Sequence, residues 1–318
     1  MSAPTTTPTP TAPPPKAVRQ LGDRIFAGSA RGAGILILVV LAGVAAFLVI
    51  QALPAIVASP ADLPGGENLA AYIGPLVFGT LLSAFIALVI ATPLAVGVAL
   101  FITHYAPRRL AQGLGYVIDL LAAVPSIVFG LWGVAVLAPA SLGLMTWLNT
   151  YLGWIPLFAG PVSATGRTML VVGVTLAVMI LPIITAVSRE VFLQTPKLHE
   201  EAALALGATR WEMIRMAVLP FGRSGIISGA MLGLGRALGE TMAVAIILSG
   251  SGIITFNLIS SSNPSSIAAN IALQFPDSTG VAVNTLIASG LVLFVITLLV
   301  NSLARYIINR RREFSGAN

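Results

Sequence analysis

QTPKLHEEAALALGATRWEMIRMAVLP, residues 194–220, is the stretch of this chain that carries the most structural information. Thr195 is placed to cap a helix that has Pro196 at its first position, because a threonine oxygen accepts from the free N–H groups of a first turn. Gly207 fits the left-handed residue that ends such a helix. The first half of the stretch therefore predicts a short helix that closes on a sharp glycine turn.

A second helix is predicted directly after this glycine. Thr209 and Glu212 have the T-x-x-E spacing of a capping box, and we expect Pro220 to stop the helix. Two interpretations of the helix pair remain open. It is either a docking element, whose small-residue ridge enters a partner's groove while Arg210 and Arg215 meet its charges, or an amphipathic loop on a membrane surface.

The chain on both sides of this stretch is strongly apolar. Of its 318 residues 57% are hydrophobic and 9% are charged, whereas soluble domains carry about a quarter charged residues. Six segments are long enough to cross a hydrocarbon core of about 30 Å. They are residues 34–53, 73–101, 114–137, 169–187, 226–248 and 281–304. We therefore predict an all-α polytopic membrane protein with six transmembrane helices.

The basic residues predict how these spans are oriented. Of the 17 Lys and Arg residues, all but Arg167 and Arg236 fall in segments that six crossings would place on one side. Such an excess marks the cytoplasmic side, so we expect both termini and residues 194–220 to be cytoplasmic. Asp119, near the cytoplasmic end of the third span, is expected to pair with Arg108, Arg109 or the backbone.

A further apolar segment, residues 141–158, carries Trp147, Tyr151 and Trp154. As a seventh crossing it would move the arginines that follow the fourth span to the outside, against the basic N-terminus. We therefore interpret it as a helix on the outer membrane surface, where aromatic side chains gather. The first span is too long for the apolar part of a signal peptide, so we expect it to be retained.

Glycines repeat at four-residue spacing in the fifth span. Gly225, Gly229 and Gly233 form overlapping GxxxG steps, and Gly235 and Gly239 add another. Small residues on one face let helices approach closely. Two interpretations stay open: dense packing within this chain, or a seam between two subunits that lines a pathway.

The same span contains two charged residues. Arg236 lies about 15 Å into it, where a charge costs at least about 2.5–3.5 kcal/mol. Glu240 follows four residues later, so in one continuous helix the two share a face and partly offset each other's cost. They form either a structural ion pair or an anion site. In the second case the guanidinium suits phosphate oxygens, and the carboxylate accepts the proton of a partly protonated phosphate, which sulfate lacks.

The sequence gives no support for catalysis. There is no Cys, both His residues stand alone, and no G-x-S-x-G is present, so we expect neither a catalytic centre nor a metal site. No G-x-x-x-x-G-K-[ST] phosphate-binding loop occurs either. We expect no cofactor in this chain, and any ATP-driven process needs a separate ATPase.

Residues 201–220 resemble a motif of a known protein family. Glu201-Ala202-Ala203, three residues, Gly207, nine residues, then Ala217-Val218-Leu219-Pro220 is similar to the EAA motif of type I ABC importer permeases. Only Ala217 departs, where isoleucine is usual. The resemblance implies a MetI-like fold in a bacterial inner membrane and an ATPase-coupling loop. The residues of that loop are Glu201, Ala202, Ala203, Gly207, Leu219 and Pro220.

Two other stretches resemble the phosphate-specific permeases of this family, in particular the PstC type. They are LAAVPSIVFG at 121–130 and LGRALGETMA at 234–243. The resemblance implies that Arg236 and Glu240 lie on the substrate pathway for inorganic phosphate. It also implies a homologous PstA-type permease, a PstB-type ATPase dimer that binds ATP and Mg²⁺, and a PstS-type phosphate-binding protein.

The resemblance also divides the chain. Residues 1–30 are expected to be a disordered Pro/Thr-rich cytoplasmic tail, a solvated leader rather than a partner-binding tail. Residues 31–71 would hold the first transmembrane helix and an outer loop, residues 72–306 the permease core, and residues 307–318 a basic cytoplasmic tail. Alternatives are a permease for another oxyanion, such as molybdate or sulfate, and an ion-driven secondary transporter or channel.

Overall fold

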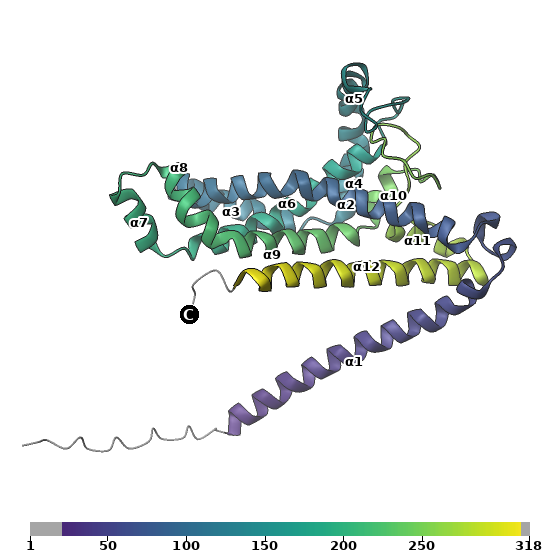
Figure 1. The fold of residues 1–318 in the computed structure, drawn as a ribbon, viewed down its shortest axis with the longest axis horizontal. Helices are drawn as coiled ribbons and strands as arrows, with labels where there is room; N and C mark the ends of the chain where they lie inside the picture. The colour runs from purple at the N-terminus through teal and green to yellow at the C-terminus, as the bar shows by residue number, and fades with distance from the viewer. Residues whose placement is uncertain (1–20, 313–318) are drawn as a thin grey trace, which may run out of the picture. The chain divides into compact units, whose positions relative to one another are not determined.

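The computed structural model describes the backbone of residues 21–312 and the side chains of residues 22–306, and this part of the chain is helical without strands (Figure 1). The α-helices are α1 (Leu21–Val57), α2 (Leu69–Leu100), α3 (Arg108–Ala122), α4 (Ser126–Trp132), α5 (Ala138–Leu152), α6 (Met169–Leu193), α7 (Lys197–Ala205), α8 (Arg210–Met213), α9 (Leu219–Leu238), α10 (Met242–Ile247), α11 (Ile267–Gln274) and α12 (Val281–Arg312). Three π-helical segments continue α2, α4 and α8: η3 (Phe101–Tyr105), η4 (Gly133–Leu137) and η5 (Ile214–Val218).

Six helices of the described chain are long and apolar enough to cross a membrane, which confirms the predicted number. They cover Gly22–Val57, Leu69–Tyr105, Ser126–Leu152, Met169–Leu193, Arg210–Leu238 and Val281–Tyr306. The chain is a multi-pass membrane protein. Taken by itself, α1 is apolar on all sides over residues 35–50, as expected of a helix that lipid surrounds.

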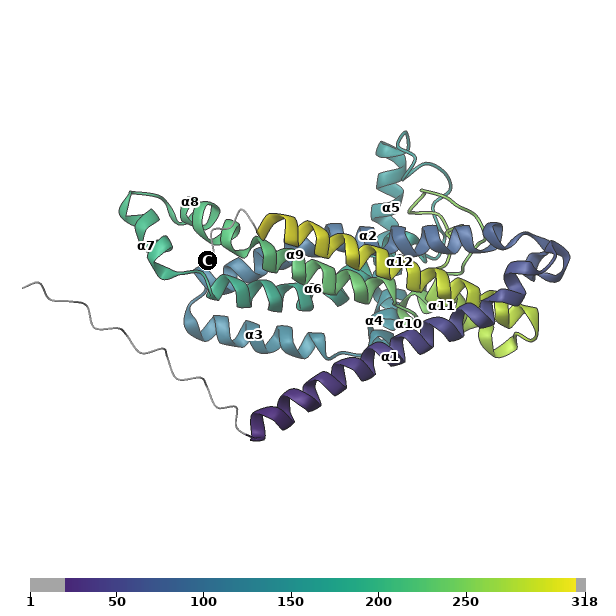
Figure 2. The same ribbon diagram turned by 60° about the horizontal axis from the view of Figure 1, so that its bottom comes forward.

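The predicted third span, 114–137, has the wrong bounds. Helix α3 ends at Ala122, and a new helix begins after Pro125, because proline disfavours the helical conformation at the residue before it. That helix continues through η4 to Leu152, so residues 141–152 are its second half rather than a separate element. The predicted separate surface helix is therefore not present as such, and in Figures 1 and 2 α5 runs across the direction of α2, α6 and α9.

The central packing joins α2, α6 and α9. A Val191 methyl carbon lies only 2.3 Å from where a Cβ on Gly225 would be, and Gly229 and Gly233 face Val187 and Ile184 in the same way. These three glycines therefore pack within the chain, which confirms that interpretation of them. Gly235 has no such neighbour within 4 Å. A stripe of buried alanines on α2 packs into the same core: Ala84, Ala87, Ala91, Ala95 and Ala99.

Both predicted tails are partly helical in the structure. Residues 1–20 of the expected disordered tail lie outside the described residues. Helix α1 already begins at Leu21, so the expectation is wrong for residues 21–30, which lack the prolines of the preceding stretch. Helix α12 continues to Arg312, so the first half of the predicted basic tail is helical, and residues 313–318 lie outside the described part.

Candidate functional site

The fifth predicted span, 226–248, is not one helix. Helix α9 ends at Leu238, Gly239 to Thr241 form an irregular link, and α10 begins at Met242. The N–H of Glu240 reaches only the carbonyl of Ala237, at 3.4 Å. Irregular backbone at membrane depth is tolerated where protein buries it or where it lines a wet cavity. The sequence stretch singled out for its charges is therefore also the place where the helix is interrupted.

Glu240 lies in the link between α9 and α10. It is 7% exposed, and its Oε1 accepts a hydrogen bond of 3.0 Å from the backbone N–H of Ala243, in the first turn of α10. The predicted pairing with Arg236 is wrong, because α9 ends between the two residues and no ion pair joins them among the described side chains. The carboxylate thus caps α10, while the guanidinium belongs to the last turn of α9.

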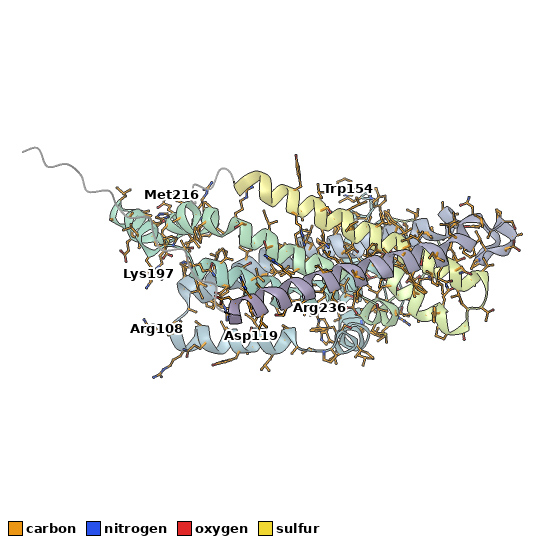
Figure 3. The ribbon with its side chains drawn as sticks, turned by 90° about the horizontal axis from the view of Figure 1, so that it is seen from below. Arg108, Asp119, Trp154, Lys197, Met216 and Arg236 are labelled. Atoms are coloured by element: carbon orange, nitrogen blue, oxygen red, sulfur yellow. The ribbon has the colours of Figure 1, made fainter. Side chains whose placement is uncertain are left out.

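Arg236 lies deep in the bundle. Gly233, three residues before it, packs against Ile180 and Ile184, near the middle of the 25-residue helix α6. Arg236 is about 4.5 Å farther along α9. Its side chain is half-buried, and Figure 3 shows it far from Lys197 and Met216 at the other end of the bundle. This position agrees with the predicted depth.

Sequence reasoning missed Arg167, which holds the other end of α10. Its Nε donates to the carbonyl of Ile247 at 3.0 Å, and a terminal nitrogen donates to the carbonyl of Ile246 at 2.6 Å. An arginine at the last carbonyls of a helix satisfies groups that have no partner within it. The one signal for this role was its isolation, since Arg167 is the only basic residue between the spans on the predicted outer side.

Helix α10 also rests directly on α4. A Cβ on Gly130 would lie 2.8 Å from the Cα of Ala243, closer than real Cβ atoms come to another backbone. Gly130 closes the stretch 121–130, and Ala243 closes the stretch 234–243. The two stretches that carry the resemblance to phosphate permeases therefore meet at this contact, beside Glu240.

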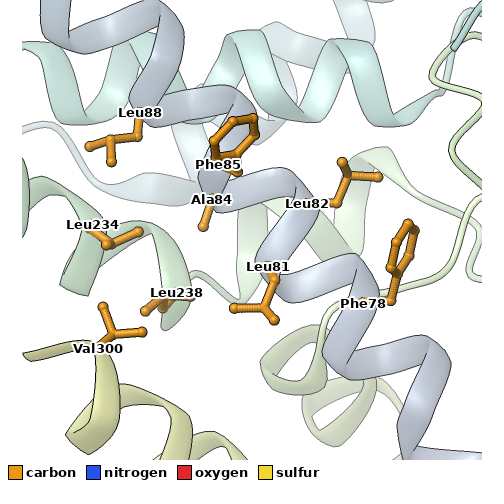
Figure 4. Close-up of a pocket in the computed structure, with 9 residues that line it drawn as sticks. All are labelled: Phe78, Leu81, Leu82, Ala84, Phe85, Leu88, Leu234, Leu238 and Val300. Atoms are coloured by element: carbon orange, nitrogen blue, oxygen red, sulfur yellow. The ribbon is translucent and has the colours of Figure 1, made fainter. Parts of the chain in front are cut away.

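An apolar cavity reaches Leu238, the last residue of α9 before the interruption. It measures about 390 Å³ and lies between α2, α9 and α12, with Leu81, Phe85, Leu234, Leu238 and Val300 among its lining residues (Figure 4). A hydrocarbon lining offers no donor to a dianion, and desolvating a charge without partners is costly. This cavity is therefore not the anion site that the sequence predicts.

At the opposite end of the bundle, residues 194–220 form the predicted helix pair. Gly207 has φ +84°, the left-handed conformation expected between the helices. The capping box is confirmed as well, because Thr209 and Glu212 exchange side-chain and backbone hydrogen bonds. Helix α7 carries Glu201, Ala202 and Ala203, as the resemblance to the EAA motif requires.

Two details of this segment were predicted wrongly. Thr195 does not cap α7: Pro196 takes the capping position, and the buried Thr195 hydroxyl has no hydrogen-bond partner. Pro220 does not end the second helix, which continues from α8 through η5 into α9. In η5 the N–H of Leu219 bonds five residues back, to Ile214, and this widened turn accommodates the proline that follows.

The outward side of residues 194–220 is open, and it mixes charged residues such as Arg210 and Arg215 with large apolar side chains. Leu198, Leu206, Trp211 and Met216 are 73%, 90%, 56% and 59% exposed. On the inner face, an apolar cluster at the ends of α2 and α6 includes Ala99, Phe192, Met213, Ile214 and Val218, with Ala203 packed against it. Such an exposed patch on an otherwise anchored element is typical of a protein–protein contact.

Asp119 has none of its expected ionic partners. It is exposed on α3, and no ion pair joins it to Arg108 or Arg109 within the described side chains. Figure 3 shows Arg108 and Asp119 at separate places along that helix. Eleven residues separate the two positions in sequence, which is about 16 Å along a helix, too far for a contact.

The chain matches the family model of the binding-protein-dependent transport system inner membrane component over residues 91–313. It is 48% identical over 298 residues to the phosphate transport system permease protein PstC 2 of Mycobacterium tuberculosis, covering 90% of this chain and 91% of that protein. The phosphate transport system permease protein PstC of Mesorhizobium japonicum is 38% identical over 310 residues, which cover 93% of either chain.

Among solved structures, a bacterial ABC transporter involved in the import of the acidic polysaccharide alginate contains a chain of the same fold. The superposition has a TM-score of 0.56 at 16% identity, and it covers 90% of this chain and 99% of that one. At this identity the likeness concerns the fold alone.

Proposed function

Because this chain belongs to the PstC branch of the binding-protein-dependent transport system inner membrane component family, we propose that it translocates inorganic phosphate as the permease subunit of an ATP-driven importer. The observation that carries the proposal is the interrupted helix at Gly239 to Thr241. It places a half-buried guanidinium and a buried carboxylate deep in an apolar bundle. Intramembrane charges of this kind mark ion and substrate pathways.

In the proposed pathway Arg236 binds phosphate oxygens through its planar fork of donors. Glu240 keeps the link in shape by capping α10, and it offers an acceptor to the proton of a partly protonated phosphate. Sulfate is fully ionised and has no proton to give, so the same pair discriminates against it. Broken helices at a binding site near the membrane midplane are a recurring device in transporters.

We propose the following assembly around this chain. A homologous PstA-type permease completes the pathway, a PstB-type ATPase dimer docks on residues 194–220, and a PstS-type binding protein delivers phosphate on the outer side. ATP and Mg²⁺ bind to the ATPase, and this chain holds no cofactor. The large apolar side chains exposed in residues 194–220 support the docking, and the basic segments support cytoplasmic termini in a bacterial inner membrane.

The function is tested by uptake into vesicles that contain the purified complex and the binding protein. We expect radiolabelled phosphate to enter only with ATP, and excess sulfate or molybdate to leave its uptake unchanged. Import of sulfate or molybdate in preference to phosphate would contradict the substrate. Uptake that an ion gradient drives without nucleotide would instead indicate a secondary transporter.

Replacing Gly207 by Ala is expected to weaken docking of the ATPase. A Cβ at φ +84° costs at least about 1 kcal/mol, although no neighbour lies within 4 Å to clash with it. We expect about fivefold weaker association of the ATPase in a titration of detergent-solubilised permease. Gly207→Asn is the matched control, because Asn tolerates the left-handed region, and it should keep most of the affinity. Equal affinities for the Ala variant and the native chain would show that the turn does not shape the docking face.

A further inference from the structure

Two consecutive residues of η3 contact the two helices of residues 194–220. The Nε2 of His104 lies 3.7 Å from the Oε1 of Glu200 on α7. The guanidinium carbon of Arg210, at the start of α8, lies 6.0 Å from the centre of the Tyr105 ring. These contacts fall on either side of the Gly207 turn. The segment that follows α2 therefore contacts α7 before the Gly207 turn and α8 after it.

The His104 contact is fixed and largely removed from solvent. The side chain of His104 is 9% exposed and that of Glu200 is 24% exposed. The other ring nitrogen, Nδ1, lies 2.7 Å from the hydroxyl oxygen of Thr103, and that hydroxyl donates its proton to the carbonyl of Ala99. An imidazole held on one side presents its other nitrogen in a defined direction. Among the described side chains, this is the one place where a basic and an acidic group lie within 4.0 Å of each other.

Helix α2 extends from this contact to the opposite end of the bundle. Its buried alanine stripe packs against the core, so the helix is closely supported along its length. Near its other end the hydroxyl of Thr80 accepts from the N–H of Ile267, at the start of α11, and Gly79 fits against the backbone of Ser265. In segment η3 the end of α2 changes to π-helical bonding, a local widening that is frequent at functional sites.

We propose that His104 is a positioning residue: through Glu200 it fixes α7 to the end of α2, so that α2 is the bundle helix that a displacement of the docking loop moves first. This inference rests on the proposed function, because it takes an ATPase to be the source of the displacement. In this account Tyr105 and Arg210 provide the second hold, on α8, and the π-helical segment provides the flexible joint.

The test is a double-mutant cycle in vesicles that contain the full complex, with phosphate imported per ATP hydrolysed as the readout. His104→Leu and Glu200→Leu are each expected to lower this ratio about fivefold, with ATP hydrolysis and assembly retained. The double variant should lose no more than either single variant, because both remove the same contact. The charge-swapped pair His104→Glu with Glu200→Lys should restore the ratio.

Losses that multiply in the double variant, or a ratio that the swapped pair leaves low, would overturn the proposal, because a general folding defect behaves in this way. The native complex in the same vesicles separates this result from a failure of the proposed function. If it imports another oxyanion, the proposed substrate is wrong, and the ratio taken for that ion still tests the contact.

Discussion

Replacing Arg236 by Gln is expected to reduce phosphate uptake about 10- to 100-fold, while the chain still inserts and still binds its ATPase. A hydrogen bond to a charged group contributes about 1.5–3 kcal/mol, which corresponds to this range. Because Arg236 has no carboxylate partner within the described side chains, its removal leaves no unpaired buried acid behind. Uptake kinetics in vesicles, with the amount of assembled complex measured in parallel, check the result.

Two variants serve as controls for this prediction. Arg236→Lys keeps the charge but loses the planar fork, so we expect an intermediate defect. Arg223→Gln removes an exposed arginine from the same helix, and its uptake should match that of the native chain. If Arg236→Gln transports phosphate as well as Arg223→Gln does, the guanidinium is not on the pathway.

Replacing Gly130 by Ala is expected to displace α10 from α4 and to impair both stability and transport. The new Cβ would lie 2.8 Å from the Cα of Ala243, and backbone cannot turn away as a side chain does. Overpacking of this kind costs about 1–3 kcal/mol. Because Glu240 and Arg167 hold the two ends of α10, the displacement strains the link that follows Arg236. A thermal melt of the solubilised complex and an uptake assay measure the two effects.

Gly97→Ala is the matched control for Gly130. Gly97 is also inside a helix, and no atom lies within 4 Å of where its Cβ would be. Alanine favours helix over glycine, so this variant should be unchanged or slightly more stable. Equal melting and uptake for the two variants would show that the contact between α4 and α10 does not constrain the site.

The features that the sequence predicted well depend on short-range signals. The capping box of Thr209 and Glu212 and the left-handed Gly207 involve neighbours within a few residues, and both are confirmed. The number of long apolar helices follows from hydropathy, because lipid leaves few other ways to satisfy a backbone. Local chemistry therefore predicted the number of long helices and the two-helix structure of residues 194–220.

The features that it missed depend on bonds that no local pattern specifies. Pro220 lies within a helix because a π-helical turn precedes it, and Gly239 ends a helix that hydropathy alone would continue. Arg167 bonds to carbonyls about 80 residues away along the chain. The predicted pair of Arg236 and Glu240 failed for the same reason, since a shared face requires an unbroken helix.

One labelling measurement tests the central claim most directly. The chain contains no cysteine, so Leu206→Cys introduces a single thiol at a position that is 90% exposed, directly after α7 in the segment proposed to bind the ATPase. We predict that a membrane-impermeant maleimide modifies this thiol from the cytoplasmic side only, and that the bound ATPase protects it. Modification from the outer side, or equal modification with and without the ATPase, would contradict the account.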